Sequence, residues 1–218
     1  MFEVPQALLQ YVTGISPSVA WDVVAVGYEF GAALLIIALV HFCERQPLAS
    51  IGVRKMRAAD FLIGTAAFIA AVVATAAIWN LLQGSAALGE IINGDDSEVE
   101  TLLNISFSAR IGLAVGTSLA EEFGARGYAI ERLTTLTGSV AIGATLAFLG
   151  ALAMHVPHRG LLALPLLAPG QLILVLVYVW RRSVGTCVIA HILTDGYSMV
   201  VFWLLPSAAR NYLWQLGL

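Results

Sequence analysis

The amino-acid sequence predicts an all-α fold, a polytopic membrane bundle of about six transmembrane helices. Two observations support this class. The 218 residues are 59% hydrophobic and only 11% charged, with a mean hydropathy of +0.86, whereas a soluble domain typically carries roughly 25% charged residues. The apolar residues also gather into stretches of about twenty, which is the length that crosses a hydrocarbon core of about 30 Å. We therefore expect residues 1–218 to form a single integral membrane domain.

The apolar stretches predict the positions of the individual helices. The expected spans are residues 19–43, 60–83, 102–131, 138–157, 161–180 and 184–205. The first span is expected to be an integral helix, because residues 1–18 contain no basic segment and no small-residue cleavage site. Between the spans, residues 44–59 predict a short basic connector, and the polar, Gly- and Asp-rich residues 84–100 predict an external loop. In the third span, the spacing of Gly112 and Gly116 predicts close packing against a neighbouring helix.

The basic residues are distributed unequally between the two ends of these helices. Eight of the eleven are expected on the side of the connector, and they are Arg45, Arg54, Lys55, Arg57, Arg126, Arg132, Arg181 and Arg182. The positive-inside rule places that side in the cytoplasm and both termini outside. We therefore expect an integral protein of a bacterial plasma membrane, whose surroundings are the lipid bilayer, with no nucleic-acid partner.

Several ionisable residues fall within the apolar spans. The third span contains the adjacent pair Glu121 and Glu122, and later spans contain His155, His191 and Asp195. Ionisable groups at membrane depth are costly and usually mark a pathway or a reaction, and two like charges in a low-dielectric site tend to share a proton. We expect all five to face one water-accessible cavity, with Arg126, one turn after Glu122, as an ion-pair partner. Taken singly, each histidine is more simply a packing residue, and the Glu122–Arg126 pair a structural lock.

These motifs resemble those of a family of intramembrane proteases, called CPBP or Abi, which includes the CAAX prenyl endopeptidases and bacteriocin-processing or immunity proteins. The family's EExxxR motif matches residues 121–126. Its FxxxH motif is matched in part, because His155 is present but Ala151 replaces the phenylalanine. Its HxxxN motif is matched by His191 with Asp195 in place of asparagine. The order and spacing also agree, and the resemblance covers roughly residues 101–205.

The resemblance implies an endopeptidase that hydrolyses a peptide bond in a membrane-associated protein or peptide. Glu121 would activate a water with help from His155, while His191 and residue 195 would stabilise the oxyanion. Glu122 and Arg126 would position Glu121. This mechanism requires no cofactor. An ionised aspartate accepts hydrogen bonds but does not donate them, so Asp195 would have to be protonated, orient His191 or bind a metal.

Three alternatives stay open at this point. Two histidines with carboxylates form a credible zinc site, whose ligands would be Glu121, His155, His191 and Asp195, although the sequence lacks the HExxH motif. A non-catalytic immunity or scaffold protein of the same fold would use these residues to bind a membrane peptide. A proton-coupled transporter would also need buried carboxylates, but the sequence shows no inverted repeat.

The expected depth of His155 in the membrane makes it difficult for the five ionisable residues to meet in one cavity. Glu121 falls near the middle of its span, whereas His155 lies a few residues before the external turn expected at residues 158–160. The five groups can meet only if the fourth helix is broken or tilted, or if residues 155–160 dip into the protein. Pro157 and Gly160 favour the second arrangement, because irregular backbone is tolerated where it lines a cavity.

Overall fold

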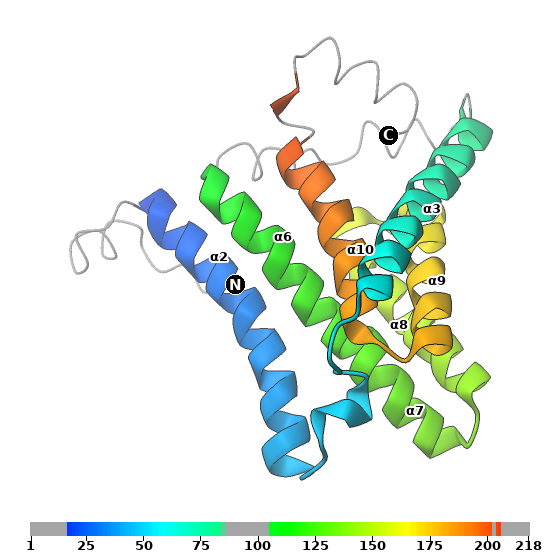
Figure 1. Cartoon of the computed structure of the whole chain (residues 1–218). Helices are drawn as coiled ribbons and strands as arrows, with labels where there is room; N and C mark the ends of the chain where they lie inside the picture. The colour runs from blue at the N-terminus through cyan, green and yellow to red at the C-terminus, as the bar shows by residue number, and fades with distance from the viewer. Residues whose placement is uncertain (1–16, 84, 86–104, 202–203, 206–218) are drawn as a thin grey trace.

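The computed structural model describes residues 17–83, 85, 105–201 and 204–205, and within them every regular element is helical. Long helices run from one end of the molecule to the other (Figure 1). Five are long and apolar enough to cross a membrane: Trp21–Cys43, Ala58–Leu82, Val140–Pro157, Leu161–Arg181 and Val184–Val201. The prediction of an all-α membrane bundle is thus confirmed. The two chain termini and most of the loop predicted at 84–100 lie outside the described residues.

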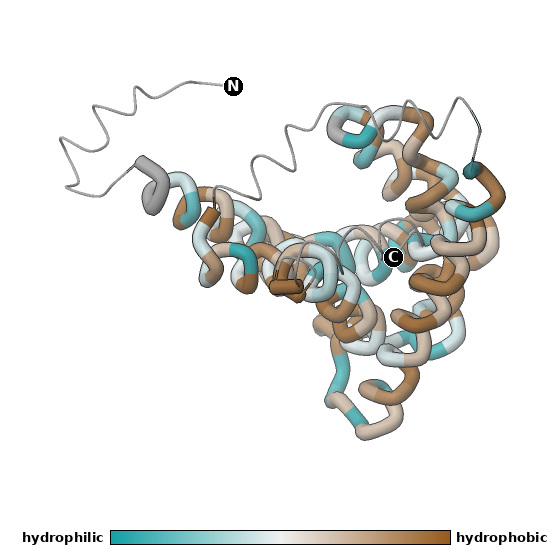
Figure 2. The backbone as a smooth tube through the Cα atoms, turned by 90° about the horizontal axis from the view of Figure 1, so that it is seen from above, coloured by the Kyte–Doolittle hydropathy of each residue, from teal (hydrophilic) through white to brown (hydrophobic). Residues whose placement is uncertain are grey.

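The five apolar spans are built from helices whose bounds lie within a few residues of those predicted. They are α2 (Pro17–Ala38), continued by the π-helical η1 (Leu39–Cys43), α3 (Ala58–Leu82), α8 (Val140–Arg159), α9 (Leu164–Arg181) and α10 (Val184–Gly196), continued by the π-helical η5 (Tyr197–Val201). Short 3-10 turns, η2 (Leu48–Ile51) and η4 (Leu161–Ala163), precede α3 and α9. Large apolar side chains such as Leu35, Leu62 and Leu176 are exposed on the outside of these helices, as expected for faces in contact with lipid. Figure 2 shows hydrophobic positions recurring along the bundle.

The span predicted at 102–131 corresponds to a continuous helix over residues 107–137 that differs from the other five. It consists of α6 (Phe107–Glu121), the π-helical η3 (Glu122–Ala129) and α7 (Ile130–Thr137). It is too polar to count among the apolar spans, because it carries Arg110, Glu121, Glu122, Arg126, Glu131 and Arg132. Such polarity is tolerated within a bundle because neighbouring helices supply partners for the charges.

Helix α6 packs closely against α2 through its two small residues. A Cβ atom added at Gly116 would lie 2.9 Å from the Cβ of Glu29, and one added at Gly112 would lie 3.0 Å from Val26. The predicted role of these glycines in close packing is therefore confirmed. A hydrogen bond also connects the same two helices. Asp22 Oδ2 of α2 accepts it from the backbone N–H of Ser106, the N-cap of α6, at 3.1 Å.

The connector between α2 and α3 folds back under the bundle. Gly52 adopts a φ of 75° there, and a Cβ atom at this position would meet the ring of Tyr178 at 2.9 Å, so only glycine fits without strain. The carbonyl of Gly52 accepts a hydrogen bond from the N–H of Val184 at 3.1 Å, at the start of α10. The same end of the bundle holds the basic residues predicted there, and of these Arg126 is fully buried between the helices.

Candidate active site

Glu122 and Arg126 form a buried ion pair at the start of η3. Both side chains are 0–1% exposed, and Arg126 Nη1 lies 2.8 Å from Glu122 Oε1. From α9, Gln171 Oε1 accepts a hydrogen bond from Arg126 Nη2 at 2.5 Å. Breaking a buried ion pair leaves an uncompensated charge, so the pair stabilises η3. The hydrogen bond from Arg126 to Gln171 then holds η3 against α9.

His191 connects α10 to the same carboxylate. Its Nδ1 lies 2.7 Å from Glu122 Oε1, and because a carboxylate only accepts hydrogen bonds, we assign the proton to Nδ1. The other ring nitrogen, Nε2, then lies 4.0 Å from Glu121 Oε2 and 3.6 Å from Asp195 Oδ2. Separations of this size exceed a direct hydrogen bond and suit a bridging water or substrate atom.

The two adjacent glutamates have different surroundings. Glu122 is fully buried, whereas the side chain of Glu121 is 30% exposed. Glu121 also has a further carboxylate nearby, because Glu29 of α2 is close enough to interact electrostatically with both Glu121 and Asp195. Glu122 is therefore held in a buried ion pair, whereas Glu121 is accessible to small molecules.

Asp195 lies on the same face of α10 as His191, one turn later. Its side chain is 14% exposed, and its Oδ2 is buried without a hydrogen-bond partner among the described residues. Arg159, at the end of α8, is near enough to interact with it electrostatically. Asp195 thus faces His191 Nε2 without forming a direct hydrogen bond to it.

His155 has no hydrogen bond or ion pair to this group within the described residues. Helix α8 continues unbroken through Pro157 to Arg159, and His155 Nδ1 is 2.9 Å from the carbonyl oxygen of Ala151, one turn earlier on the same helix. No hydrogen bond or ion pair in the described part of the chain joins His155 to Glu121 or His191. The predicted dip of residues 155–160 does not occur. Direct contacts therefore join Glu122, Arg126 and His191, with Glu121 and Asp195 within 4.0 Å of the imidazole, whereas His155 has no direct polar contact with them among the described residues.

The four residues considered as zinc ligands do not form a metal centre. Within the described residues, no three His, Cys, Asp or Glu side chains are arranged to hold a metal ion. His191 Nδ1 is already occupied by Glu122. The arrangement of the described residues therefore does not support the zinc site that the sequence left open as an alternative.

Gln171 is a member of this cluster that the sequence did not single out. It is 7% exposed and supplies the acceptor that Arg126 requires. The available signal was an amide inside an otherwise apolar span, since polar groups at membrane depth need a partner. The π-helical geometry of η3 gave no such signal, because hydrophobic periodicity does not distinguish it from an α-helix. π-helical turns recur at functional sites.

Comparison with known proteins identifies the part of the chain that contains the cluster. Residues 103–197 match the family model described as Rce1-like, type II CAAX prenyl endopeptidase. The match confirms the resemblance found in the sequence, and it spans α6 to α10. No curated protein and no solved structure matches the chain.

Proposed function

Since residues 103–197 carry the Rce1-like domain of the type II CAAX prenyl endopeptidases, we propose that this chain is an intramembrane endopeptidase. It hydrolyses a peptide bond in a membrane-associated protein by means of a water activated by Glu121. The observation that carries the proposal is the position of Glu121: its side chain is 30% exposed and lies 4.0 Å from His191 Nε2, directly beside the buried ion pair.

In this mechanism Glu121 acts as general base. Its carboxylate takes a proton from water, and the hydroxide oxygen attacks the scissile carbonyl carbon to give a tetrahedral oxyanion. Glu121 then returns the proton to the amide nitrogen. The C–N bond breaks, releasing an amine and a carboxylic acid. General-base catalysis of this kind contributes roughly 10²–10⁴-fold.

His191 is proposed to stabilise the oxyanion through Nε2. Its Nδ1–H is directed at Glu122, which fixes the orientation of the ring. Because Glu121, Glu122 and Asp195 all face the ring, a protonated imidazole would balance their charge, and its Nε2–H could donate to the oxyanion. One such donor is worth roughly 10²–10³-fold. Asp195, whose Oδ2 lies 3.6 Å from Nε2, would support the charged form of the imidazole.

The substrate is proposed to be membrane-associated, because the cluster lies among helices that cross the bilayer. We further propose that the end bearing the connector is cytoplasmic, since the excess of basic residues is at that end. Cysteine labelling tests this orientation. Labelling from outside the cell at a cysteine introduced at Ser50 would reverse it.

The activity is tested by comparing membrane proteomes of cells that produce the wild type, Glu121→Gln or Glu44→Gln. Glutamine has the shape of glutamate but takes no proton at neutral pH, so Glu121→Gln is expected to lose cleavage by at least roughly 10²-fold. Glu44→Gln makes the same chemical change at a carboxylate of the basic end that has no direct contact with Glu121 or His191 among the described residues, and it is expected to cleave normally. New protein termini that appear equally with wild type and Glu121→Gln would refute the proposal, and a complete lack of cleavage by all three proteins would favour the non-catalytic alternative.

A further inference from the structure

The basic end of the bundle carries more positive charge than its carboxylates neutralise. Three carboxylates there, Glu44, Asp60 and Glu131, each have arginine partners. The ion pairs are Arg132 with Glu44, Arg54 and Arg181 with Asp60, and Arg182 with Glu131. These pairs account for every carboxylate described at this end.

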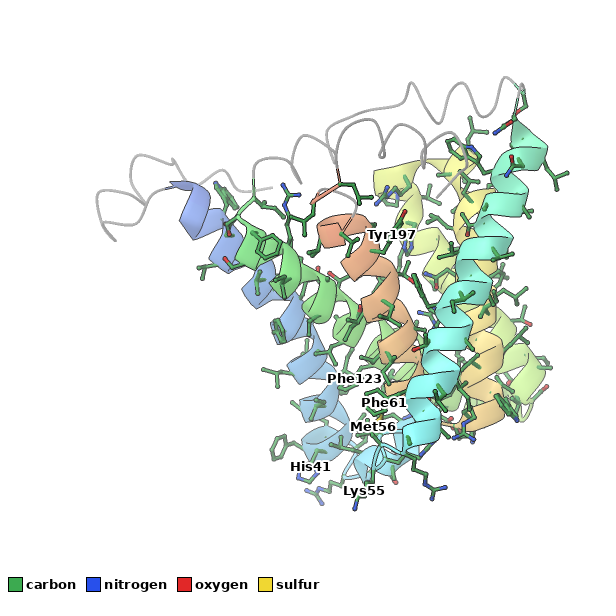
Figure 3. All side chains as sticks on the ribbon, turned by 45° about the horizontal axis from the view of Figure 1, so that its top comes forward. His41, Lys55, Met56, Phe61, Phe123 and Tyr197 are labelled. Carbon is green, nitrogen blue, oxygen red and sulfur yellow. The ribbon has the colours of Figure 1, made fainter. Side chains whose placement is uncertain are left out.

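Three basic side chains of the connector are left over. Arg45, Lys55 and Arg57 are exposed, and none has an ion-pair partner among the described residues. Figure 3 shows Lys55 at the same end of the molecule as His41, beyond the ends of the long helices, with Tyr197 at the opposite end. The surplus of charge is therefore concentrated on one short segment at one face.

These three residues flank the ends of two membrane spans. The span Trp21–Cys43 ends two residues before Arg45, and the span Ala58–Leu82 begins directly after Arg57. Charged side chains at the ends of membrane-spanning helices are expected to reach the level of the lipid headgroups. Basic residues next to a membrane span attract anionic lipids, with an effect that grows with each added charge.

We propose that Arg45, Lys55 and Arg57 form a binding site for the phosphate groups of anionic lipids. Lysine and arginine bind phosphate through charge-assisted hydrogen bonds. Phosphate could also come from solution, but the position of the three side chains beside the two spans favours the lipid headgroup, because lipid phosphates are concentrated at that level.

The connector that would hold the lipid is packed against the candidate active site. The carbonyl oxygen of Ile51 lies 2.8 Å from where a Cβ atom of Gly127 would be, next to Arg126 in η3. The neighbouring residue, Gly52, accepts the hydrogen bond from Val184, at the start of the helix that carries His191. A lipid that orders the connector would therefore also stabilise η3, which contains the buried ion pair, and the start of α10, which carries His191. This coupling to activity rests on the proposed function, whereas lipid binding does not.

The test measures lipid binding to the full chain directly. Wild type and the triple variant Arg45→Gln/Lys55→Gln/Arg57→Gln are purified, and retention of phosphatidylglycerol and phosphatidylcholine is compared by native mass spectrometry. The triple variant is expected to lose phosphatidylglycerol affinity by roughly 10²-fold, with little change for phosphatidylcholine. The triple lysine/arginine exchange Arg45→Lys/Lys55→Arg/Arg57→Lys, which keeps the charge, is expected to restore most of the binding.

Two control variants show whether the loss of lipid is specific to these three residues. Arg110→Gln, which removes a positive charge in α6, should leave phosphatidylglycerol retention unchanged. Glu121→Gln should also bind the lipid normally, so failure of the proposed protease activity would not affect the result. Equal retention by wild type and the triple variant would overturn the proposal, as would complete displacement of the lipid by millimolar inorganic phosphate, which would assign the site to the free anion.

Discussion

Two buried carboxylates in this protein are both paired with arginine, yet their surroundings differ. Asp60 is fully buried at the basic end, and its oxygens accept hydrogen bonds from Arg54, Arg181, Thr186 and the backbone of Arg57 at 2.7–3.1 Å. Glu122 is equally buried, but only its Oε1 is engaged. Its Oε2 has no hydrogen-bond partner within the described residues, and neither does Nε of Arg126.

We interpret this difference as one between a structural contact and a contact within the proposed active site. Buried polar groups are nearly always satisfied, so those that are not call for a physical reason. At Asp60 every oxygen has a partner, and the residue ties the connector to α3, α9 and α10. Around Glu122 the unused hydrogen-bonding capacity lies beside the partly exposed Glu121, where water and a substrate carbonyl would have to be accommodated.

The strongest test of this comparison is Glu122→Gln. The change leaves Arg126 buried without a counter-charge and is expected to lower the free energy of unfolding by about 3–5 kcal/mol. Unfolding in detergent, followed by circular dichroism, measures the loss. The neighbouring Glu121→Gln is the matched control, because a partly exposed carboxylate should contribute far less. Equal stability of the two variants would show that the ion pair is not a lock.

Asp60→Asn is expected to have a smaller effect on stability. It removes the charge that Arg54 and Arg181 share, but these side chains are 27% and 23% exposed and can be solvated instead. We expect a loss of about 1–3 kcal/mol, with activity falling only as far as the folded fraction does. A collapse of turnover in a fully folded Asp60→Asn protein would contradict the structural role.

Asp195→Asn should change the free energy of unfolding little. Its effect on peptide hydrolysis distinguishes the glutamate mechanism from a metal-dependent one. The amide restores the family's residue and adds a donor beside His191, so turnover is expected to stay within a few-fold of wild type or to rise. Peptide hydrolysis and metal content are measured on the same preparation. A sharp loss of activity together with stoichiometric zinc in the wild type would replace the glutamate mechanism with a metal-dependent one.

The smallest expected effect concerns pH at Glu44. Hydrogen bonds from Arg132, and then from Tyr128, hold the pKa of Glu44 below its ordinary value. Because the pKa is lowered on folding, this contact stabilises the protein above the ordinary glutamate pKa, and its contribution is lost as the pH falls through the folded-state pKa. Unfolding measured between pH 7 and pH 3 should show a slight excess acid sensitivity relative to Glu44→Gln. Identical pH profiles would exclude a contribution from this contact.

The fold was largely predictable from the sequence because lipid imposes length and apolarity on each span. The third helix was found despite its polarity, and the close approach at Gly116 followed from spacing alone. The cluster was predictable in part. The i,i+4 relations Glu122–Arg126 and His191–Asp195 are local and were correctly paired on their helices.

Contacts between helices were less accessible to sequence reasoning. Nothing local indicates that His191 would meet Glu122 and not Glu121, because this depends on how α10 packs against η3. The partner of Arg126 on α9 was missed for the same reason. His155 was placed in the cluster by its motif, whereas in the structure its ring turns back to the carbonyl oxygen of Ala151, where the family has a phenylalanine.

The π-helical conformation of η3 also affects the phase of the helix that follows it. In an α-helix each residue advances about 100° around the axis, and a wider i→i+5 turn accommodates extra residues before the chain returns to the same face. The face presented by α7 is therefore rotated relative to a straight continuation of α6. Glu131 and Arg132, which follow the wide turns, meet Tyr178 and Glu44 at the basic end. A single-residue deletion within Glu122–Ala129 would rewind this segment and turn α7 away from those partners.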